Sequence, residues 1–324
     1  MNTLARIVSL DTLQAWRREV GGDHPVAVVR GTFDFFHPGN LYAIQKAREC
    51  SLPVMALVDP DEVAIRHGQP GYPQNHLETR VEMVSHLRGV SAVASLASDE
   101  VEEGLAGLAP FVWIAGARGS RKDSFEGVLA SRASRVEELA PLAGCFSGDI
   151  IRAMEANRTP LLLPEGWDAV AGQDKMEIPK QFGKRVTVNG CFDVLHVGHL
   201  RFLAEARRMG DFLTVLINND ASVARYKGST RPVFPETFRA AALRALVSVD
   251  EVVAFPGDNP LAEIRQLRPA IHVKGGSYEP ERVSQERELV EGWGGRLVCT
   301  PMVDGFSTTN FIQKALKRKT QNTP

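Results

Sequence analysis

The chain has 324 residues, 44% of them hydrophobic and 24% charged, and it carries a formal net charge of −1. This length suits two domains, each with enough apolar residues to bury a core of its own. A net charge so close to zero gives no electrostatic reason to expect a partner that is a nucleic acid or an anionic membrane, so neither is expected.

The first predicted element is a helix that precedes the first strand. Residues 8–20, "VSLDTLQAWRREV", indicate an amphipathic lead-in helix. Charged residues interrupt the stretch 1–20, which therefore reads as neither a signal peptide nor a membrane anchor. The four cysteines lie far apart without metal-binding spacing, so we expect reduced thiols in a cytoplasmic protein.

Short apolar strands then alternate with helical stretches, most clearly in the second half of the chain. The predicted strands are 185–190, 211–218, 250–255 and 269–276, and the predicted helices are 197–210, 235–246 and 260–267. Their runs of Val, Ile and Leu are typical of strands that are buried on both faces. These features predict a doubly wound α/β domain, whose ligand binds at the carboxyl ends of parallel strands.

The second half of the chain repeats the first with a shift of 159 residues. "VRGTFDFFHPGNLYA" at 29–43 matches "VNGCFDVLHVGHLRF" at 188–202, so that His37 falls on His196. Other segments keep this shift to within one residue, and a period of this length indicates a duplicated domain.

The repeat predicts two tandem Rossmann-like domains of the α/β class, each with a doubly wound parallel sheet. Residues 157–184 break the pattern with prolines, glycines and mixed charge, and are interpreted as a linker. The expected boundaries are therefore 1–156 for the first domain with its lead-in helix, 157–184 for the linker, and 185–324 for the second domain.

The segment after the strand 185–190 carries the residues expected to do chemistry. His196 and His199 lie at the start of the next helix, whose free backbone amides suit a phosphate. Two imidazoles that donate to phosphate oxygens would stabilise the charge that grows around phosphorus during transfer. From this stretch alone they could also be metal ligands or helix caps. No third His, Cys or Asp group completes a zinc site nearby, so no metal bound by protein ligands is expected.

Glycines, cations and hydroxyl residues surround this pair. Gly190 and Gly198 would let the backbone approach a ligand closely, and Lys227 and Arg231 would neutralise a triphosphate unless they form an ordinary solvated loop. Cations and hydroxyls without a nucleophile–base pair suit in-line phosphoryl or nucleotidyl transfer. The predicted nucleotide-binding residues are Gly190, Cys191, Phe192, Asp193, Gly198, Arg239, Lys274, Gly275, Ser307, Thr308 and Thr309.

These motifs together resemble the HxGH nucleotidyltransferase superfamily of cytidylyltransferases and adenylyltransferases. The second copy is most similar to the adenylyltransferase domain of bacterial heptose-1-phosphate enzymes, through "NGCFDVLHVGHLRFLAEARRMGD", "YKGSTRPV", "VKGGSY" and "DGFSTTN". The resemblance covers nearly all of 184–317. It implies that both domains are nucleotidyltransferase-like and that Mg²⁺ accompanies the nucleotide.

The resemblance also implies roles for the site residues. His196 and His199 would stabilise the transition state at the α-phosphate, and Lys227 and Arg231 would be further catalytic residues that engage the phosphates or the substrate. The hydroxyl run 307–309 would hold the triphosphate tail. The expected partners are an NTP and a phosphorylated small molecule.

The choice of nucleotide follows from two departures. Cytidylyltransferases for phosphoalcohols show an RTEGxST stretch where this chain reads "MVDGFST", with Met302 in place of the arginine, and an acidic GDDW-like stretch where it reads "VKGGSY". These departures favour ATP, with a sugar 1-phosphate such as heptose 1-phosphate as the acceptor. The tandem layout, however, resembles ethanolamine-phosphate cytidylyltransferases. A CTP-dependent enzyme for ethanolamine phosphate or glycerol 3-phosphate therefore stays an alternative, as does a non-catalytic nucleotide-binding scaffold.

The first copy departs from the motif at its chemical positions. Asn40 stands where the second histidine would be, His67 replaces Lys227, and Ala115 replaces Lys274. Its apolar strands persist, so we expect a role in packing, pairing or regulation. The duplication leaves a homodimer and an internal pseudo-dimer as alternatives.

Overall fold

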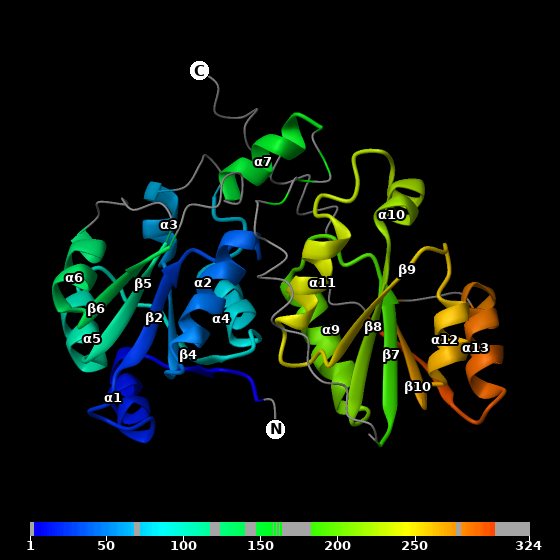
Figure 1. Cartoon of the computed structure of the whole chain (residues 1–324), viewed down its shortest axis with the longest axis horizontal. Helices are drawn as coiled ribbons and strands as arrows, with labels where there is room; N and C mark the ends of the chain where they lie inside the picture. The colour runs from blue at the N-terminus through cyan, green and yellow to red at the C-terminus, as the bar shows by residue number, and fades with distance from the viewer. Residues whose placement is uncertain are drawn as a thin grey trace. The chain divides into compact units, whose positions relative to one another are not determined.

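The computed structural model describes residues 3–67, 72–116, 124–139, 147–157, 159, 161, 163, 183–276 and 280–301 (Figure 1). They form two compact units: the N-terminal unit, which ends at Ile151, and the C-terminal unit, which begins at Arg152. Most of the predicted linker lies outside the described residues. None of the described helices is long and apolar enough to cross a membrane.

The N-terminal unit is built on a parallel sheet of six described strands in the order β1-β4-β3-β2-β5-β6. The strands are β1 (Arg6–Ile7), β2 (Val26–Gly31), β3 (Val54–Val58), β4 (Val90–Ala94), β5 (Phe111–Ala115) and β6 (Arg135–Glu138). The helices are α1 (Leu10–Glu19), α2 (Pro38–Glu49), α3 (Asp61–His67), α4 (Leu77–Ser85), α5 (Val101–Leu108) and α6 (Ser124–Arg132), and α7 (Ser147–Glu155) spans the boundary between the units.

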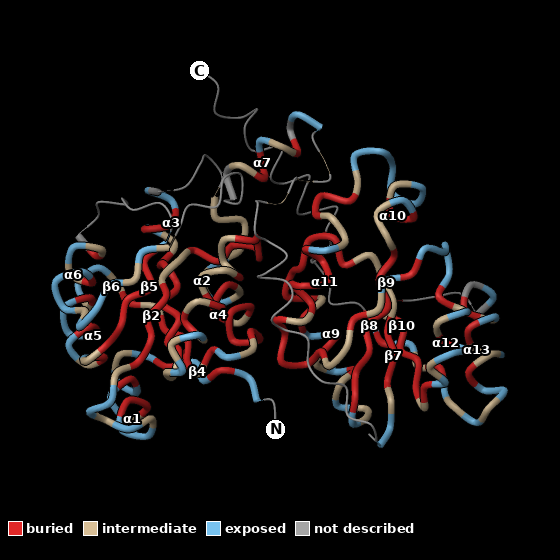
Figure 2. The backbone as a smooth tube through the Cα atoms, viewed as in Figure 1, coloured by how far each residue is buried: buried red, intermediate tan, exposed pale blue. Residues whose placement is uncertain are grey.

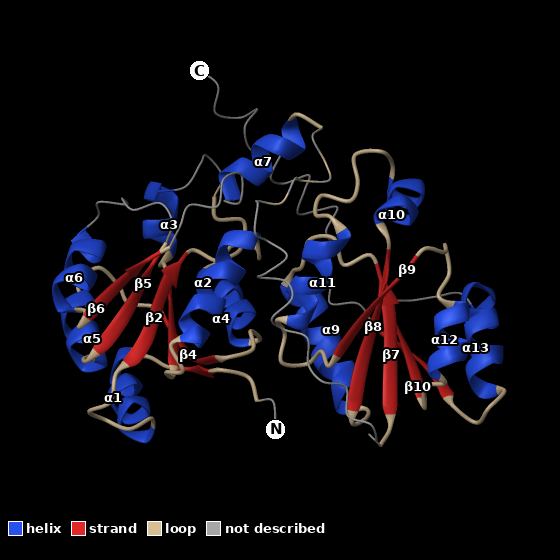
Figure 3. Cartoon of the chain, in the orientation of Figure 1, coloured by secondary structure: helices blue, strands red, loops and turns tan. Residues whose placement is uncertain are grey.

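The C-terminal unit repeats this plan with five described strands in the order β11-β10-β7-β8-β9, all parallel (Figure 3). The strands are β7 (Arg185–Gly190), β8 (Phe212–Asn218), β9 (Glu251–Phe255), β10 (Ile271–Gly275) and β11 (Arg296–Thr300). The helices are α9 (Val197–Arg208), α10 (Asp220–Lys227), α11 (Glu236–Arg244), α12 (Leu261–Leu267) and α13 (Ser284–Glu291), with a 3₁₀ turn η1 (Pro280–Val283) before α13.

These two sheets confirm the predicted fold class. Helices α9 and α11 cover one face of the C-terminal sheet, and α12 and α13 cover the other (Figure 3). Figure 2 shows that the strands of both units are largely buried, as their apolar runs predicted. The lead-in helix is also confirmed, because α1 packs Leu13 and Trp16 into the core of the N-terminal unit.

Helices α10 and α13 and strand β11 were not predicted. Helix α10 is short: the Asn219 side chain caps its first turn by accepting the Ser222 backbone N–H (2.9 Å), and it ends at Gly228, whose φ is 97°. Helix α13 is rich in charged residues, and only part of it is buried. Helices α10 and α13 have few apolar residues and β11 has only five residues, so none of them gives a strong periodic signal.

The strand order places the topological switch point between β7 and β10, where ligands bind in open α/β sheets. Backbone pairing between these strands ends at Val188 and Val273. By contrast, β7 pairs with β8 as far as Gly190, and β10 pairs with β11 as far as Gly275. The two central strands therefore separate at their carboxyl ends, where the predicted site lies.

Candidate active site

The two histidines of the C-terminal unit lie where β7 leads into α9. His196 is the N-cap of α9, with extended backbone, and its Nδ1 accepts the backbone N–H of His199 at 3.4 Å. The two imidazole rings stack with their centroids 3.7 Å apart and their planes 21° from parallel. The structure thus brings both predicted histidines together at a helix N-terminus, whose amides and dipole favour a phosphate.

Burial keeps both imidazoles neutral at physiological pH. Desolvation lowers the pKa of His196 to about 4. Desolvation, aided by the neighbouring His196, holds the pKa of His199 well below its ordinary value. Because Nδ1 of His196 accepts a hydrogen bond, the proton of the neutral ring lies on Nε2, which can therefore donate to a phosphate oxygen.

The loop before α9 is shaped around Phe192. This residue has a φ of 46°, in the left-handed region that non-glycine residues rarely adopt, and its ring lies 5.3 Å from that of His199. A Cβ on Gly190 would lie 3.0 Å from the Phe192 ring, so a larger residue there would displace this ring. Nδ1 of His199 is shielded from solvent and has no hydrogen-bond partner within the described chain.

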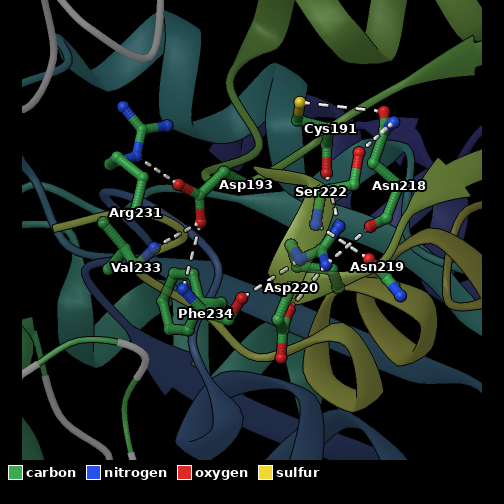
Figure 4. Close-up of polar contacts among 10 residues, drawn as sticks. Cys191, Asp193, Asn218, Asn219, Asp220, Ser222, Arg231, Val233 and Phe234 are labelled. Atoms are coloured by element: carbon green, nitrogen blue, oxygen red, sulfur yellow. Dashed lines mark hydrogen bonds and ion pairs between the residues drawn. The ribbon is translucent and has the colours of Figure 1, made fainter. Parts of the chain in front are cut away.

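Asp193 fastens this loop to the segment after α10 (Figure 4). Its Oδ1 accepts the backbone N–H groups of Val233 (2.8 Å) and Phe234 (3.0 Å), and its Oδ2 pairs with Nε of Arg231. The two Nη groups of Arg231 point away from Asp193 (Figure 4). The carboxylate of Asp193 is thus used to hold the loop and to orient the arginine.

Arg239 was predicted to bind the nucleotide, but its side chain lies in the interior of the unit. It is 1% exposed and donates to the carbonyl oxygens of Cys191, Asn218 and Phe234 and to the carboxylate of Asp220, at 2.7–3.1 Å. A guanidinium with these partners holds the loop and strand ends in place instead of facing a ligand.

Three cations act on the Cys191 thiol in the loop before α9. Burial raises the pKa of this thiol, and the positive charges of Lys227, Arg239 and Arg231 oppose the rise. Lys227, at the exposed end of α10, therefore lies within electrostatic reach of the motif. Neighbouring Arg225 instead forms an exposed ion pair with Asp258 at 2.6 Å.

Lys274 ends up in a buried polar cluster that the sequence did not reveal. Its Nζ donates to Oδ1 of Asn189 at 2.9 Å and to Oε1 of Glu286 at 2.8 Å. Glu286 comes from α13, and no motif in the sequence pointed to it. The neighbouring Gly275 fits closely, because a Cβ there would lie 3.1 Å from the Phe202 ring.

The other predicted site residues are one glycine of α9 and three hydroxyl residues near the C-terminus. Gly198 is buried in the first turn of α9. Ser307, Thr308 and Thr309 lie outside the described residues. Over the residues that the structure describes, no cluster of His, Cys, Asp or Glu side chains could hold a metal ion.

The N-terminal unit keeps the frame of this site and lacks part of its chemistry. His37 caps α2 as His196 caps α9, with Nδ1 accepting the Asn40 backbone N–H at 3.3 Å. Asp34 accepts two backbone N–H groups, as Asp193 does. Asn40, however, cannot supply a second imidazole.

Comparisons with known proteins agree with the duplication. The family model described as cytidylyltransferase-like matches residues 28–144 and again 187–314. The "Bifunctional protein HldE" of Syntrophotalea carbinolica is 49% identical over 150 residues, which cover 46% of this chain and 30% of the relative. The protein of the same name from Magnetococcus marinus is 35% identical over 319 residues, which cover 85% of this chain and 65% of the relative.

The chain thus spans about a third of the first of these relatives and just under two thirds of the second. Among solved structures, the "lipopolysaccharide core biosynthesis protein from Thermoplasma volcanium GSS1" aligns with 38% of this chain and 99% of its own. The sequence identity is 24% and the TM-score 0.34.

Proposed function

Since the chain belongs to the cytidylyltransferase-like family, we propose that its C-terminal unit is a nucleotidyltransferase that joins AMP from ATP to a sugar 1-phosphate. The proposed acceptor is of the heptose 1-phosphate class, and pyrophosphate is the second product. Support for ATP comes from the resemblance of the motifs to heptose-1-phosphate adenylyltransferases, and the similarity to HldE proteins points the same way.

The observation that carries the proposal is the stacked, neutral imidazole pair at the N-terminus of α9. A phosphate oxygen of the acceptor attacks the α-phosphorus of the nucleotide. The bond between that phosphorus and the oxygen bridging to the β-phosphate breaks, and pyrophosphate leaves with the electron pair. During this step Nε2–H of His196 donates to a non-bridging oxygen on which charge develops, and the proposed role of His199 requires its single N–H to turn from the Val194 backbone to the phosphate.

Two cations complete the proposed site. Arg231 is held through Nε by Asp193, so its paired Nη groups suit bidentate contact with a phosphate (Figure 4). Lys227 stands at the exposed end of α10 and suits a more mobile charge at the triphosphate or the acceptor phosphate. Ser307, Thr308 and Thr309 are proposed, from the sequence alone, to hold the triphosphate tail.

Mg²⁺ is proposed to enter with the nucleotide. Both carboxylate oxygens of Asp193, the acidic residue of the motif, are occupied by the backbone and by Arg231. The donor set that fits the ion is therefore phosphate oxygens and water, as is usual for Mg²⁺ bound with nucleotides. When bound, the ion neutralises phosphate charge.

The N-terminal unit is proposed to serve packing, pairing or regulation, in a cytoplasmic protein that is a homodimer or an internal pseudo-dimer. The two arrangements differ in mass in solution, which light scattering would measure directly.

Pyrophosphate release tests the proposed reaction. Each of ATP, CTP, GTP and UTP is supplied with Mg²⁺ and with sugar 1-phosphates, ethanolamine phosphate or glycerol 3-phosphate. Release with ATP and a sugar 1-phosphate is expected. Release with CTP and a phosphoalcohol would replace the proposal, and no release from any pair would leave a nucleotide-binding scaffold.

A further inference from the structure

The face of the C-terminal sheet that α12 and α13 cover carries a stripe of polar side chains beside its apolar core. Residues on neighbouring parallel strands that are paired in register point to the same face, so a stripe of side chains can be followed across the sheet. The polar residues of this stripe are Arg185, Thr187 and Asn189 on β7, Thr214 on β8, Glu251 on β9, and His272 and Lys274 on β10.

The N-terminal unit shows that the fold does not need this polarity. The 159-residue shift places apolar residues at six of the seven positions, and all six belong to the core of that unit. Buried polar and charged groups can be replaced by well-packed apolar ones without loss of stability. The counterparts, in the same order, are Val26, Val28, Arg30, Met55, Ala92, Trp113 and Ala115.

Within this stripe, Lys274 and Asn189 stand at the point where the two central strands part. They directly follow Val273 and Val188, the last backbone-paired residues of β10 and β7. The 2.9 Å hydrogen bond between Nζ of Lys274 and Oδ1 of Asn189 therefore continues the connection where the backbone ladder has stopped.

Glu286 of α13 holds the lysine in this position. Its Oε1 accepts from Nζ of Lys274 at 2.8 Å, and both side chains are 10% exposed. Oε2 of Glu286 is shielded from solvent and has no partner within the described chain. Burying this ion pair costs the desolvation of two charges, and apolar side chains could fill the same space.

We propose that Lys274, Asn189 and Glu286 form a positioning bridge that fixes the separation of the carboxyl ends of β7 and β10. The bridge acts through β7: Asn189 immediately precedes Gly190 and the loop that leads to His196. This inference rests on the proposed function, because it gives the bridge the task of presenting that loop to the nucleotide. Nothing in the sequence motifs assigns Asn189 or Glu286 a role.

The residues at the equivalent positions of the N-terminal unit do not form this connection. Ala115 replaces Lys274 and has no group that could reach β2. Arg30, at the position of Asn189, turns to a different partner: its Nε donates to Asp59 at 2.8 Å, and its guanidinium lies 4.1 Å from the centre of the Phe125 ring. The unit that lost the second histidine thus also lost the link across its switch point.

The test is Asn189→Ala, which cuts the link to β7 and leaves the Lys274–Glu286 ion pair intact. The matched control is Thr187→Val, which removes a side-chain hydrogen bond between the same two strands, to His272, where the backbone ladder is still paired. Val28 occupies that position in the N-terminal unit. Dissociation constants for ATP with Mg²⁺ are measured by calorimetry, alongside KM, kcat and thermal midpoints.

Asn189→Ala is expected to raise Kd and KM for ATP about tenfold, with a smaller fall in kcat and an unchanged thermal midpoint. Thr187→Val is expected to leave Kd within about twofold of the wild type. If Lys274 instead contacts the phosphates directly and the bridge has no role, Asn189→Ala would bind ATP as the wild type does. That result would overturn the proposal, and so would an equal loss in both variants.

A double variant tests the bridge without leaving a buried charge unpaired. Lys274→Met combined with Glu286→Leu removes both charges together, as the N-terminal unit has done with the lysine, and should keep the thermal midpoint. It is expected to weaken ATP binding about tenfold or more; wild-type affinity would refute the bridge. A wild-type protein that binds ATP but releases no pyrophosphate would refute the proposed function alone, and one that binds no nucleotide would refute both.

Discussion

Replacing either of the two histidines at the start of α9 should lower catalysis far more than it lowers stability. His199→Ala removes one donor to the developing charge, and loss of a comparable donor costs about 2.7–4 kcal/mol, or roughly 10²–10³ in kcat. The same is expected of His196→Ala. Because the donors act mainly in the transition state, KM for ATP should change much less than kcat.

His196 also caps α9, so its replacement carries a second, structural cost. The loss of an N-cap side chain destabilises a protein by about 1 kcal/mol, which lowers the thermal midpoint of a unit of this size by about 2–4 °C. His196→Asn keeps a capping side chain but removes the imidazole. It should therefore retain the midpoint while losing activity as fully as His196→Ala.

The N-terminal unit supplies the matched control. His37 caps α2 with the same geometry, at 3.3 Å from the backbone nitrogen of Asn40. His37→Ala should thus lower stability as His196→Ala does, yet leave kcat unchanged. Pyrophosphate release under saturating ATP and acceptor, together with thermal unfolding, measures both quantities. Near wild-type turnover by both His196→Ala and His199→Ala would refute the reasoning.

Three further outcomes are expected. Asn40→Ala should leave kcat at the wild-type value in the pyrophosphate assay, and a large fall would show that the N-terminal unit is catalytic. The free energy of unfolding should decline as the pH falls from about 6.5 towards 4. Burial lowers the pKa of His196 to about 4 and that of His37 to about 3, so the unfolded chain takes up protons before the folded chain does. A thermal midpoint that stays constant over this pH range would contradict this expectation. Arg239→Ala should cost about 3 kcal/mol or more in denaturant unfolding, since it leaves buried carbonyl oxygens without donors, and a loss below about 1 kcal/mol would show that the guanidinium is not needed there.

The sequence was a good guide to the fold because the repeat and the apolar strands are strong signals. The buried strands β7 and β8 were predicted within one residue of their observed ends. Helix α13 and strand β11 were not predicted because their sequences, "SQERELVE" and "RLVCT", are short and include charged residues. Periodicity detects an element through its apolar face, and these faces are small.

The cationic residues show that residue type alone does not predict the surroundings of a side chain. Lys227, Arg239 and Lys274 look alike in a sequence, as positive charges near strand or helix ends. The structure leaves Lys227 exposed, places Arg239 among backbone carbonyls, and pairs Lys274 with Glu286. A motif fixes which residues lie near the site, whereas burial and partners decide which of them can face a ligand.

Because the domain is duplicated, residues that serve the fold can be told apart within one chain from residues that serve the proposed site. Asp34 and Asp193, and likewise Arg80 and Arg239, make equivalent bonds in the two units, although one unit lacks the second histidine. These aspartate and arginine pairs therefore belong to the fold that the two units share. The second imidazole and Lys274 occur in the C-terminal unit, whereas Asn40 and Ala115 stand at these positions in the N-terminal unit. The buried ion pair of Lys274 and Glu286 carries a desolvation cost, and the proposed positioning bridge gives it a role beside the proposed nucleotide site.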